Sequence, residues 1–380
     1  MKKIYVILPL MALFACTTRH SIEISNPLDI DRENEVTAIS LAEIRNVVGY
    51  SSFVITERNG KEVPYQITHD SLVVFPVTIE AGATITYDIE KGKPASVDTI
   101  ACGNFYAQRK DDFAWENDKA AYRAYGAALQ ASGERAFGYD VWTKSVAHPV
   151  VAKRYREAFA KIANFHEDNG DGMDVYTVGP TLGAGTAALI DSHGVIVFPW
   201  CFESYEILDN GPLRFCVRLN YPPSTFGKDS LVRESRVITL DAGEFLNRTE
   251  VIYDGLSEQA TVAPGIVLHR HNPDGYLLDN EKSFMAYADL TDNPDGQNGI
   301  IYVGVVAPQA DTVALSPMVQ PEGDGVAHLL AKGAYHPGTT YTYYWGSGWS
   351  KGFMPDWQQW TSYLGDFKKR IENPLKAHAK

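Results

Sequence analysis

Short apolar runs separated by turn residues are the feature that most limits how this chain can fold. Runs such as Leu213–Leu219, Arg248–Tyr253 and Gly299–Val306 have the length and the β-branched and aromatic content of strands. The chain also holds 21 Tyr, 16 Phe, 7 Trp and 31 Gly in 380 residues. Large aromatic side chains favour strands, and glycine favours the turns between them. We therefore expect a mainly β protein.

The runs fall into two groups, which predict two β domains after a leader. Residues 17–95 carry short strands with turns at Asn59-Gly60 and Gly82, and predict a small N-terminal β-sandwich. A polar stretch with Gly and Pro at residues 90–94 marks the boundary. Residues 96–380 predict a large antiparallel two-sheet sandwich with few short helices. Helices are expected at Val151–Phe165 and near the C-terminus at Phe367–Ile371.

Residues 1–16 predict a lipoprotein signal peptide. Lys2 and Lys3 precede an apolar run from Ile4 to Phe14, and Ala15-Cys16 ends the segment. This pattern resembles a bacterial lipobox, in which Cys16 is lipidated and becomes the mature N-terminus. The alternative is an ordinary secretory signal. We expect an outer-membrane lipoprotein on the periplasmic or the cell-surface face.

The net charge of the chain argues against nucleic acid as a binding partner. The net charge is -13, and an acidic surface repels phosphate backbones, so nucleic acid is not expected as a partner.

Besides Cys16, the chain has Cys102, Cys201 and Cys216. In an oxidising compartment a Cys201–Cys216 disulfide is conceivable, but burial as thiols is the preferred interpretation for all three.

The segment from Gln108 to Gly126 interleaves charged and aromatic side chains. It contains Arg109, Trp115, Glu116 and Arg123 among four acids, four bases and four aromatic residues. Neither a helical nor a strand period is cleanly kept. A sugar site needs flat rings for stacking and ionised groups for hydroxyls and carboxylates. The alternative is an exposed charged strand edge.

The segment His166–Asp174 (HEDNGDGMD) can be interpreted as the site of a catalytic base or as a cation-binding loop. A histidine beside carboxylates can serve as a general base. Glu167, Asn169 and Asp171 also match part of a Ca²⁺ loop, although the twelfth position is Val178, which cannot ligate. A plain Asn/Gly turn is the third interpretation. We expect no metal or other cofactor, and keep Ca²⁺ as the alternative.

Two further segments carry candidate residues. His269-Arg270-His271 ends an apolar run, and its histidines could act as an acid/base pair, as metal ligands or as a hydrogen-bonded strand end. Trp345, Trp349 and Lys351 lie in a run that enters a Gly/Ser loop. They would suit the rim of a carbohydrate site, and the alternative is a core strand with a capping loop.

Several long motifs resemble one family. They are Arg109–Gly126, Asp140–Lys144, His166–Asp174, Val178–Gly185 and Tyr344–Lys351. The sequence resembles Bacteroidota lipoproteins catalogued as domain of unknown function 4861, over most of the chain after about residue 24. The resemblance implies a companion of pectin- and ulvan-degrading enzymes, with some relatives similar to dehydratases of uronic-acid oligosaccharides. It also implies a galactose-mutarotase-like supersandwich fold.

The leading functional prediction is a lyase or dehydratase that performs β-elimination on uronic-acid-containing oligosaccharides. This chemistry removes the C5 proton beside a carboxylate whose developing charge must be stabilised. His166 would be the base, Arg109 and Arg123 would hold the carboxylate, Glu116 or His271 would protonate the leaving oxygen, and Trp115, Trp345, Trp349 and Lys351 would bind sugar.

Two alternatives remain open. A glycoside hydrolase would use a carboxylate pair formed by Glu116 with Asp118 or Glu167. A non-catalytic glycan-binding surface lipoprotein would use the same aromatic residues in an open groove.

Overall fold

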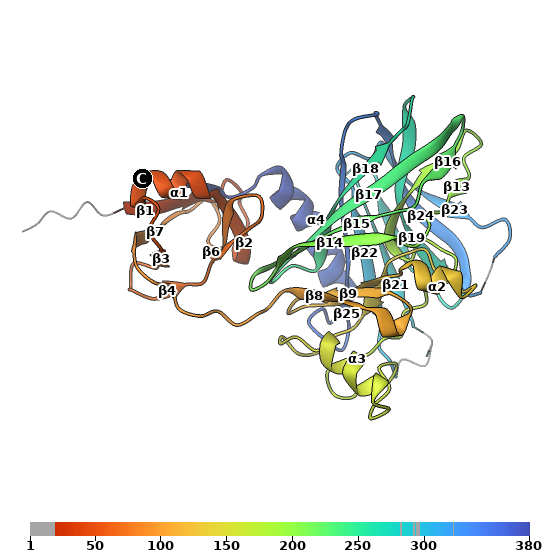
Figure 1. Cartoon of the computed structure of the whole chain (residues 1–380), viewed down its shortest axis with the longest axis horizontal. Coiled ribbons are helices and arrows are strands. Elements are labelled where there is room, and N and C mark those ends of the chain that lie inside the picture. The colour runs from red at the N-terminus through yellow and green to blue at the C-terminus, as the bar shows by residue number, and fades with distance from the viewer. Residues whose placement is uncertain (1–19, 282, 292, 294–296, 322) are drawn as a thin grey trace, which may run out of the picture.

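The computed structural model describes residues 20–281, 283–291, 293, 297–321 and 323–380. The predicted signal peptide and Cys16 lie outside them. Within the described residues the chain is mainly β, with several antiparallel sheets and four short α-helices, which confirms the prediction of a mainly β protein. Figure 1 shows two lobes, a smaller one formed by the start of the chain and its C-terminal end, and a larger one formed by the segment between them.

The small lobe contains two sheets and a helix. The first sheet, in spatial order, is β26 (Lys376–Ala379), β1 (His20–Ser25), β7 (Thr84–Lys91), β3 (Phe53–Thr56) and β4 (Glu62–Val63). The second is β2 (Arg32–Ser40), β6 (Leu72–Ile79) and β5 (Gln66–Ile67). Helix α1 (Leu41–Val48) follows Ser40, whose hydroxyl accepts a hydrogen bond from the Ala42 backbone and so caps the helix.

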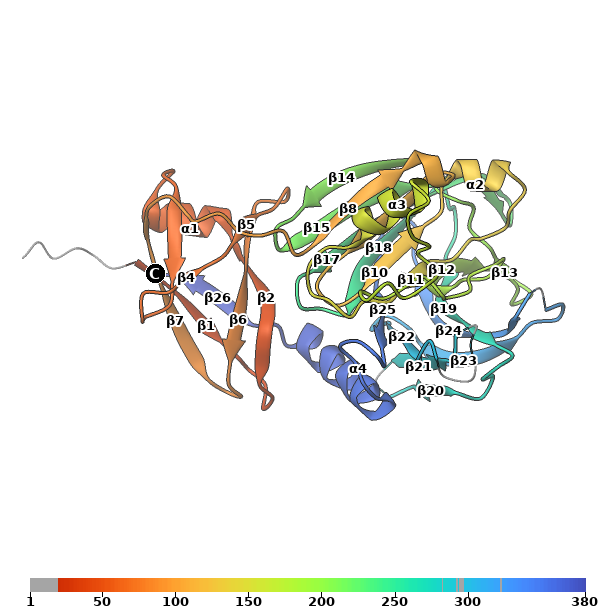
Figure 2. The ribbon, with the colours of Figure 1, turned by 90° about the horizontal axis from the view of Figure 1, so that it is seen from below.

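The C-terminus returns to this small lobe. Strand β26 pairs with β1, although the two ends are more than 350 residues apart in the chain. Figure 2 shows helix α4 (Trp357–Glu372) running from the larger lobe toward that strand. The sequence predicted only the last turn of this helix. Arg370 on α4 forms ion pairs with Glu35 of the small lobe and Glu244 of the larger one, which links the two lobes.

The larger lobe is dominated by one sheet, here called the large sheet. Its order is β14 (Ser204–Asn210), β15 (Arg214–Asn220), β17 (Asp229–Asp241), β18 (Leu246–Asp254), β25 (Tyr341–Trp349), β22 (Ile301–Val306), β21 (Phe284–Asp289) and β20 (Tyr276–Asp279), and β16 (Ser224–Phe226) pairs with β17. Helix α4 packs Trp360 and Leu364 against β21 and β22 on the outer face of this sheet.

Two smaller sheets complete the larger lobe. The second sheet is β13 (Ile196–Val197), β12 (Ala184–Ile190), β19 (Ala260–His269), β24 (Gly325–Tyr335) and β23 (Thr312–Pro317). The cover sheet is β11 (Asp140–Trp142), β10 (Ala121–Ala124), β9 (Asp112–Glu116) and β8 (Cys102–Tyr106). Both pack on the inner face of the large sheet and share one core with it.

Short helices lie around the cover sheet. They are the 3₁₀ turn η1 (Ala107–Arg109), α2 (Ala127–Ala131) and α3 (Val151–Phe159). The sequence predicted that α3 continues to Phe165, but it ends earlier, and Lys161 just beyond it has a left-handed backbone with φ of 57°. In the described part of the chain, no helix is long and apolar enough to cross a membrane.

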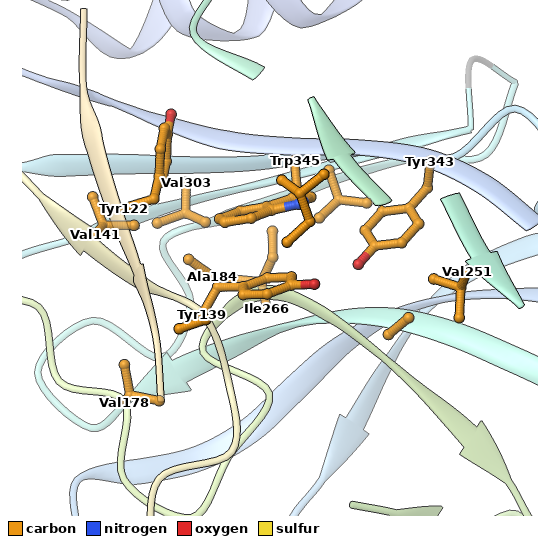
Figure 3. Close-up of a cluster of buried hydrophobic side chains, with 14 of the residues drawn as sticks. Tyr122, Tyr139, Val141, Val178, Ala184, Val251, Ile266, Val303, Tyr343 and Trp345 are labelled. Atoms are coloured by element: carbon orange, nitrogen blue, oxygen red, sulfur yellow. The ribbon is translucent and has the colours of Figure 1, made fainter. Parts of the chain in front are cut away.

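Aromatic side chains fill the core between the layers. The Trp345 ring of β25 stacks on Tyr139 with ring centres 4.1 Å apart, and Tyr122 of β10 meets it edge-on. Figure 3 shows these rings together among Val and Ile side chains. The indole nitrogen of Trp345 donates to the Thr249 hydroxyl at 2.8 Å, so the ring is buried without an unpaired polar atom.

Candidate functional site

The charged segment around residue 112 folds as a hairpin of β9 and β10 with one apolar and one charged face. Phe113 and Trp115 enter the main core, whereas Asp112 and Glu116 lie on the opposite face because side chains alternate along a strand. Both carboxylates are buried. The alternative of an exposed charged strand edge is therefore wrong, because further protein covers this face.

Arg123 is the centre of that charged face. It lies on β10 in register with Asp140 of β11 and forms an ion pair with it. Its Nη1 is 3.4 Å from Oδ2 of Asp112, and its Nη2 is 3.0 Å from Oδ2 of Asp174. We call these four residues the Arg123 cluster. All four side chains are nearly or fully inaccessible to solvent.

Helix α3 and the segment after it cover the cluster. The Tyr155 hydroxyl on α3 donates to Oδ2 of Asp112 at 2.9 Å. The Trp142 ring lies 5.1 Å from the Arg123 guanidinium, in a cation–π arrangement that desolvation strengthens. The cluster is thus enclosed between the cover sheet and α3.

The cluster combines three carboxyl groups with one guanidinium. Burial raises the pKa of Asp174 to about 8, although the Arg123 guanidinium opposes this rise. Burial also raises the pKa of Asp112. Among the described residues, Asp112 Oδ1 and Arg123 Nε have no hydrogen-bond partner. A carboxylic acid that keeps its proton near neutral pH, beside unpaired polar atoms, is typical of a functional site.

His166 lies at the solvent-exposed edge of the cluster. Its Nδ1 is 2.7 Å from the backbone oxygen of Asp174 and 3.6 Å from that residue's Oδ2. A carbonyl oxygen only accepts, so Nδ1 carries the hydrogen and the lone pair is on Nε2. The side chain is 55% exposed. The geometry therefore gives His166 a fixed tautomer suited to accepting a proton from an external molecule.

The charge of Arg109 acts on one member of the cluster, Asp112. Arg109 ends η1 and is half-buried, and its charge, together with that of Arg123, opposes the rise that burial causes in the pKa of Asp112. Within the described residues Arg109 forms no ion pair. The next two residues, Lys110 and Asp111, have φ of 53° and 65°. Such left-handed backbone is strained for residues other than glycine and often occurs at functional sites.

The structure contradicts two of the predicted roles in this hairpin. Arg123 was predicted to hold a substrate carboxylate, but three protein carboxylates already surround it. Glu116 was predicted as an acid, but it accepts hydrogen bonds from Lys144 Nζ at 2.6 Å and from the backbone nitrogens of Val150 and Val151 at the start of α3. Glu116 therefore neutralises a buried lysine and caps a helix.

The carboxylate pair of the hydrolase alternative also does not form around Glu116. Asp118 lies in the turn between β9 and β10, where its Oδ1 accepts a hydrogen bond from the Gly243 backbone nitrogen at 2.7 Å. Glu167 is exposed, and its Oε1 is within 3.4 Å of the Asn164 side chain. A buried, fully engaged Glu116 cannot contact a glycosidic oxygen in this conformation.

The predicted stacking tryptophans are core residues. Trp115 and Trp345 are 0% exposed and Trp349 is 4% exposed. Trp115 donates to Asn247 Oδ1 at 2.7 Å, and Trp349 donates to the Asn298 backbone oxygen at 2.8 Å. All three rings belong to the buried core, so they cannot stack on a sugar. The sequence pattern does not distinguish a tryptophan in the protein core from one on the rim of a sugar site.

The remaining predicted residues lie on the surface. Lys351 is exposed above the Trp349 ring and donates to the Gln297 backbone oxygen. His271 is also exposed, whereas His269 is buried and its Nδ1 is 2.6 Å from Asp289 Oδ2. The strand ends at His269, so the two histidines do not share a strand face as the alternation predicted.

The predicted cation loop is held by its own hydrogen bonds. Asp171 lies 3.0 Å from both Arg154 Nε and Lys153 Nζ, so protein cations already neutralise it. The Asn169 side chain donates to the backbone oxygens of Asn164 and Glu167. These contacts contradict the proposed Ca²⁺ ligands, because a cation would have to displace two positive side chains.

Sequence reasoning missed Asp112, Asp140 and Asp174, three members of the cluster. Each lies within one of the motifs that resemble the family, but nothing in the sequence indicates that the three carboxyl groups meet on one arginine.

The three remaining cysteines, Cys102, Cys201 and Cys216, are free thiols in the described structure, so the Cys201–Cys216 disulfide does not form.

Similar structures give only a distant fold likeness. An α-mannosidase from Enterococcus faecalis V583 and a glycosyl hydrolase family 38 protein from E. faecalis each match at a TM-score of 0.49 and 7% identity. The matches cover 95% of this chain but only 46% and 47% of those chains. The chain thus spans about half their length, and at this TM-score the likeness supports no conclusion about activity.

Sequence comparison gives a closer result. A Formosa agariphila protein described as "Uncharacterized protein P7" is 25% identical over 376 residues, covering 93% of this chain and 92% of that protein. The family model for "Domain of unknown function (DUF4861)" matches residues 24–377. These residues include the Arg123 cluster, Arg109 and His166. The chain therefore belongs to the family of domain of unknown function 4861.

Proposed function

We propose that this protein is a carbohydrate-active enzyme that performs β-elimination on uronic-acid-containing oligosaccharides. The observation that carries the proposal is the environment of His166. Its exposed imidazole is anchored through Nδ1 on Asp174, next to the Arg123 cluster, and the charge of Arg109 acts on Asp112 of the same cluster. A base and a guanidinium are the groups that elimination from a uronate requires.

The proposed reaction uses His166 and Arg109 directly. His166 Nε2 removes the proton from C5 of the uronate, the electron pair of that C–H bond forms the C4–C5 double bond, and the bond from C4 to its oxygen breaks. The imidazolium then returns its proton to the leaving oxygen. Arg109 pairs with the uronate carboxylate and stabilises the charge that develops there.

The Arg123 cluster is proposed to position His166. Asp174 holds the imidazole through its backbone oxygen, and Arg123 holds Asp174 through its carboxyl group. A positive charge that develops on His166 during the reaction would be favoured by the backbone oxygen of Asp174, which accepts the Nδ1 hydrogen. Arg123 and its aspartates would act without touching the substrate.

The test is an elimination assay on pectic, ulvan and related oligosaccharides. Formation of a 4,5-unsaturated uronate raises ultraviolet absorbance, and we expect His166→Ala and Arg109→Ala to abolish this rise. His193→Ala and Arg156→Ala change exposed residues of the same types elsewhere and should leave it unchanged.

Other outcomes of that assay would contradict the proposal. Products found by mass spectrometry without an absorbance rise would indicate hydrolysis. Retention of an oligosaccharide without any product would indicate a glycan-binding protein. Activity that survives in His166→Ala would exclude the proposed base.

We also propose that the mature protein is tethered to the outer membrane through a lipid on Cys16, with the small lobe acting as a spacer. The lipobox-like segment before Cys16 supports this. Labelling with a radioactive fatty acid should mark the wild type but not Cys16→Ser. Equal release of both proteins into the soluble periplasmic fraction would overturn the tether.

A further inference from the structure

We propose that His69, Asp209 and Cys216 form a binding site for a zinc-type transition-metal ion where the small lobe meets the large sheet. His69 lies in the turn between β5 and β6 of the small lobe, whereas Asp209 and Cys216 lie on β14 and β15 of the large sheet. The site is separate from the Arg123 cluster, and the inference does not depend on the proposed elimination.

The fold brings Asp209 and Cys216 together by strand register. They are directly opposite each other in the β14–β15 pair, just after a register shift that follows Ile207. Such an irregularity re-aims side chains at the point where it occurs. Phe215 and Val217 face the core, so alternation directs Cys216 to the outer face of the large sheet, toward the small lobe.

His69 completes the group from the other lobe. Its Nδ1 is 2.6 Å from Asp209 Oδ2, and its backbone nitrogen donates to Asp209 Oδ1 at 2.9 Å. One candidate ligand atom from each of the three residues lies within 4.8 Å of the other two. Zinc bonds of about 2.0–2.3 Å to nitrogen, oxygen and sulfur place ligand atoms about 3–4 Å apart. Small side-chain rotations are therefore sufficient.

The ligand types indicate which metal would bind. A thiolate with an imidazole and a carboxylate favours zinc-like ions over Ca²⁺ or Mg²⁺, which prefer oxygen ligands. The His69 backbone nitrogen occupies Asp209 Oδ1, and contacts of this kind orient ligands in metal sites. A bound metal ion would take the place of the present contact between Asp209 Oδ2 and His69 Nδ1.

A cavity gives access to the site. It has a volume of about 530 Å³ and is lined by His69, Asp70 and Cys216 together with charged residues of the large sheet and α4. Asp209 and Cys216 are buried, but the His69 side chain is 38% exposed. Three protein ligands leave a fourth position for water or for Asp70, as in zinc sites that keep an open position.

The experiment measures zinc bound to the purified full chain after removal of free metal. We expect one Zn²⁺ per chain by mass spectrometry of the metal content. His69→Ala and Cys216→Ser should each weaken binding by more than the roughly tenfold that loss of an outer-shell partner costs. His193→Ala and Cys201→Ser, which change an exposed histidine and a buried thiol outside the site, should bind as the wild type does.

A second measurement uses Co²⁺ in place of Zn²⁺. Coordination by Cys216 would give a thiolate-to-cobalt charge-transfer band, absent in Cys216→Ser. His69 lies in a partly exposed turn, so its variant should remain folded, which circular dichroism can check. Failure of the wild type to bind zinc stoichiometrically would overturn the proposal. Binding that neither variant weakens would also overturn it, because other histidines would then be the ligands.

Discussion

Nη2 of Arg123 lies 3.0 Å from Oδ2 of Asp174, a residue 51 positions later in the chain. This ion pair joins the cover sheet to the segment that carries His166, because His166 binds the backbone oxygen of Asp174. The arrangement of the candidate base thus depends on a buried charge cluster that sequence inspection did not identify.

Replacement of Arg123 by Met should destabilise the protein strongly. The change leaves the carboxyl groups of Asp112, Asp140 and Asp174 buried without their cation, and breaking a buried ion pair costs about 3–5 kcal/mol. Urea unfolding would measure the difference in the free energy of unfolding. Arg156→Met on the exposed face of α3 should change it by about 0.5 kcal/mol or less, and an equally small effect at Arg123 would contradict this account.

Asp174 should make stability fall as pH rises. Its pKa increases from 3.8 to about 8 on folding because of burial. The folded state therefore binds more protons than the unfolded state between these values, and the free energy of unfolding decreases with pH through that window. Asp174→Asn cannot titrate, so the wild type should lose stability relative to this variant from pH 4 to pH 8. A constant difference across this range would show that Asp174 keeps an ordinary pKa.

Glu116 should prove structural rather than catalytic. Glu116→Gln leaves Lys144 buried without a negative partner and should lower the free energy of unfolding by about 3 kcal/mol or more. The double variant Glu116→Gln/Lys144→Met should recover part of the loss, because no charge then remains buried. A folded Glu116→Gln protein with the elimination rate abolished would instead support an acid role.

Trp345 should matter for stability and not for contact with a sugar. Trp345→Ala opens a cavity next to Tyr139 and should cost about 3–5 kcal/mol. Trp200, which is 49% exposed, is the matched control, and its replacement by Ala should have a much smaller effect on stability. Thermal and urea unfolding of both variants would check this. A stable Trp345→Ala protein that loses oligosaccharide affinity would restore the stacking role.

Much of the fold could be predicted from local pattern. Runs such as Gly299–Val306 have the period and composition of strands wherever they lie, because strand preference comes from side chains that fit a pleated, half-buried surface. Long-range pairing was not predictable in this way. No local pattern indicates that Lys376–Ala379 pairs with His20–Ser25, since this register depends on how α4 directs the chain back to the small lobe.

The sequence by itself determined the mainly β class and the family motifs, and it indicated His166 as the candidate base. Only the tertiary structure decided which candidates are exposed. Trp115 and Trp345 have the composition of a sugar platform, but a second layer covers them. Charge and aromaticity are properties of single residues, whereas burial and pairing depend on segments that are distant in the chain. Arg123 therefore became the centre of a buried cluster, and His166 stayed at its exposed edge.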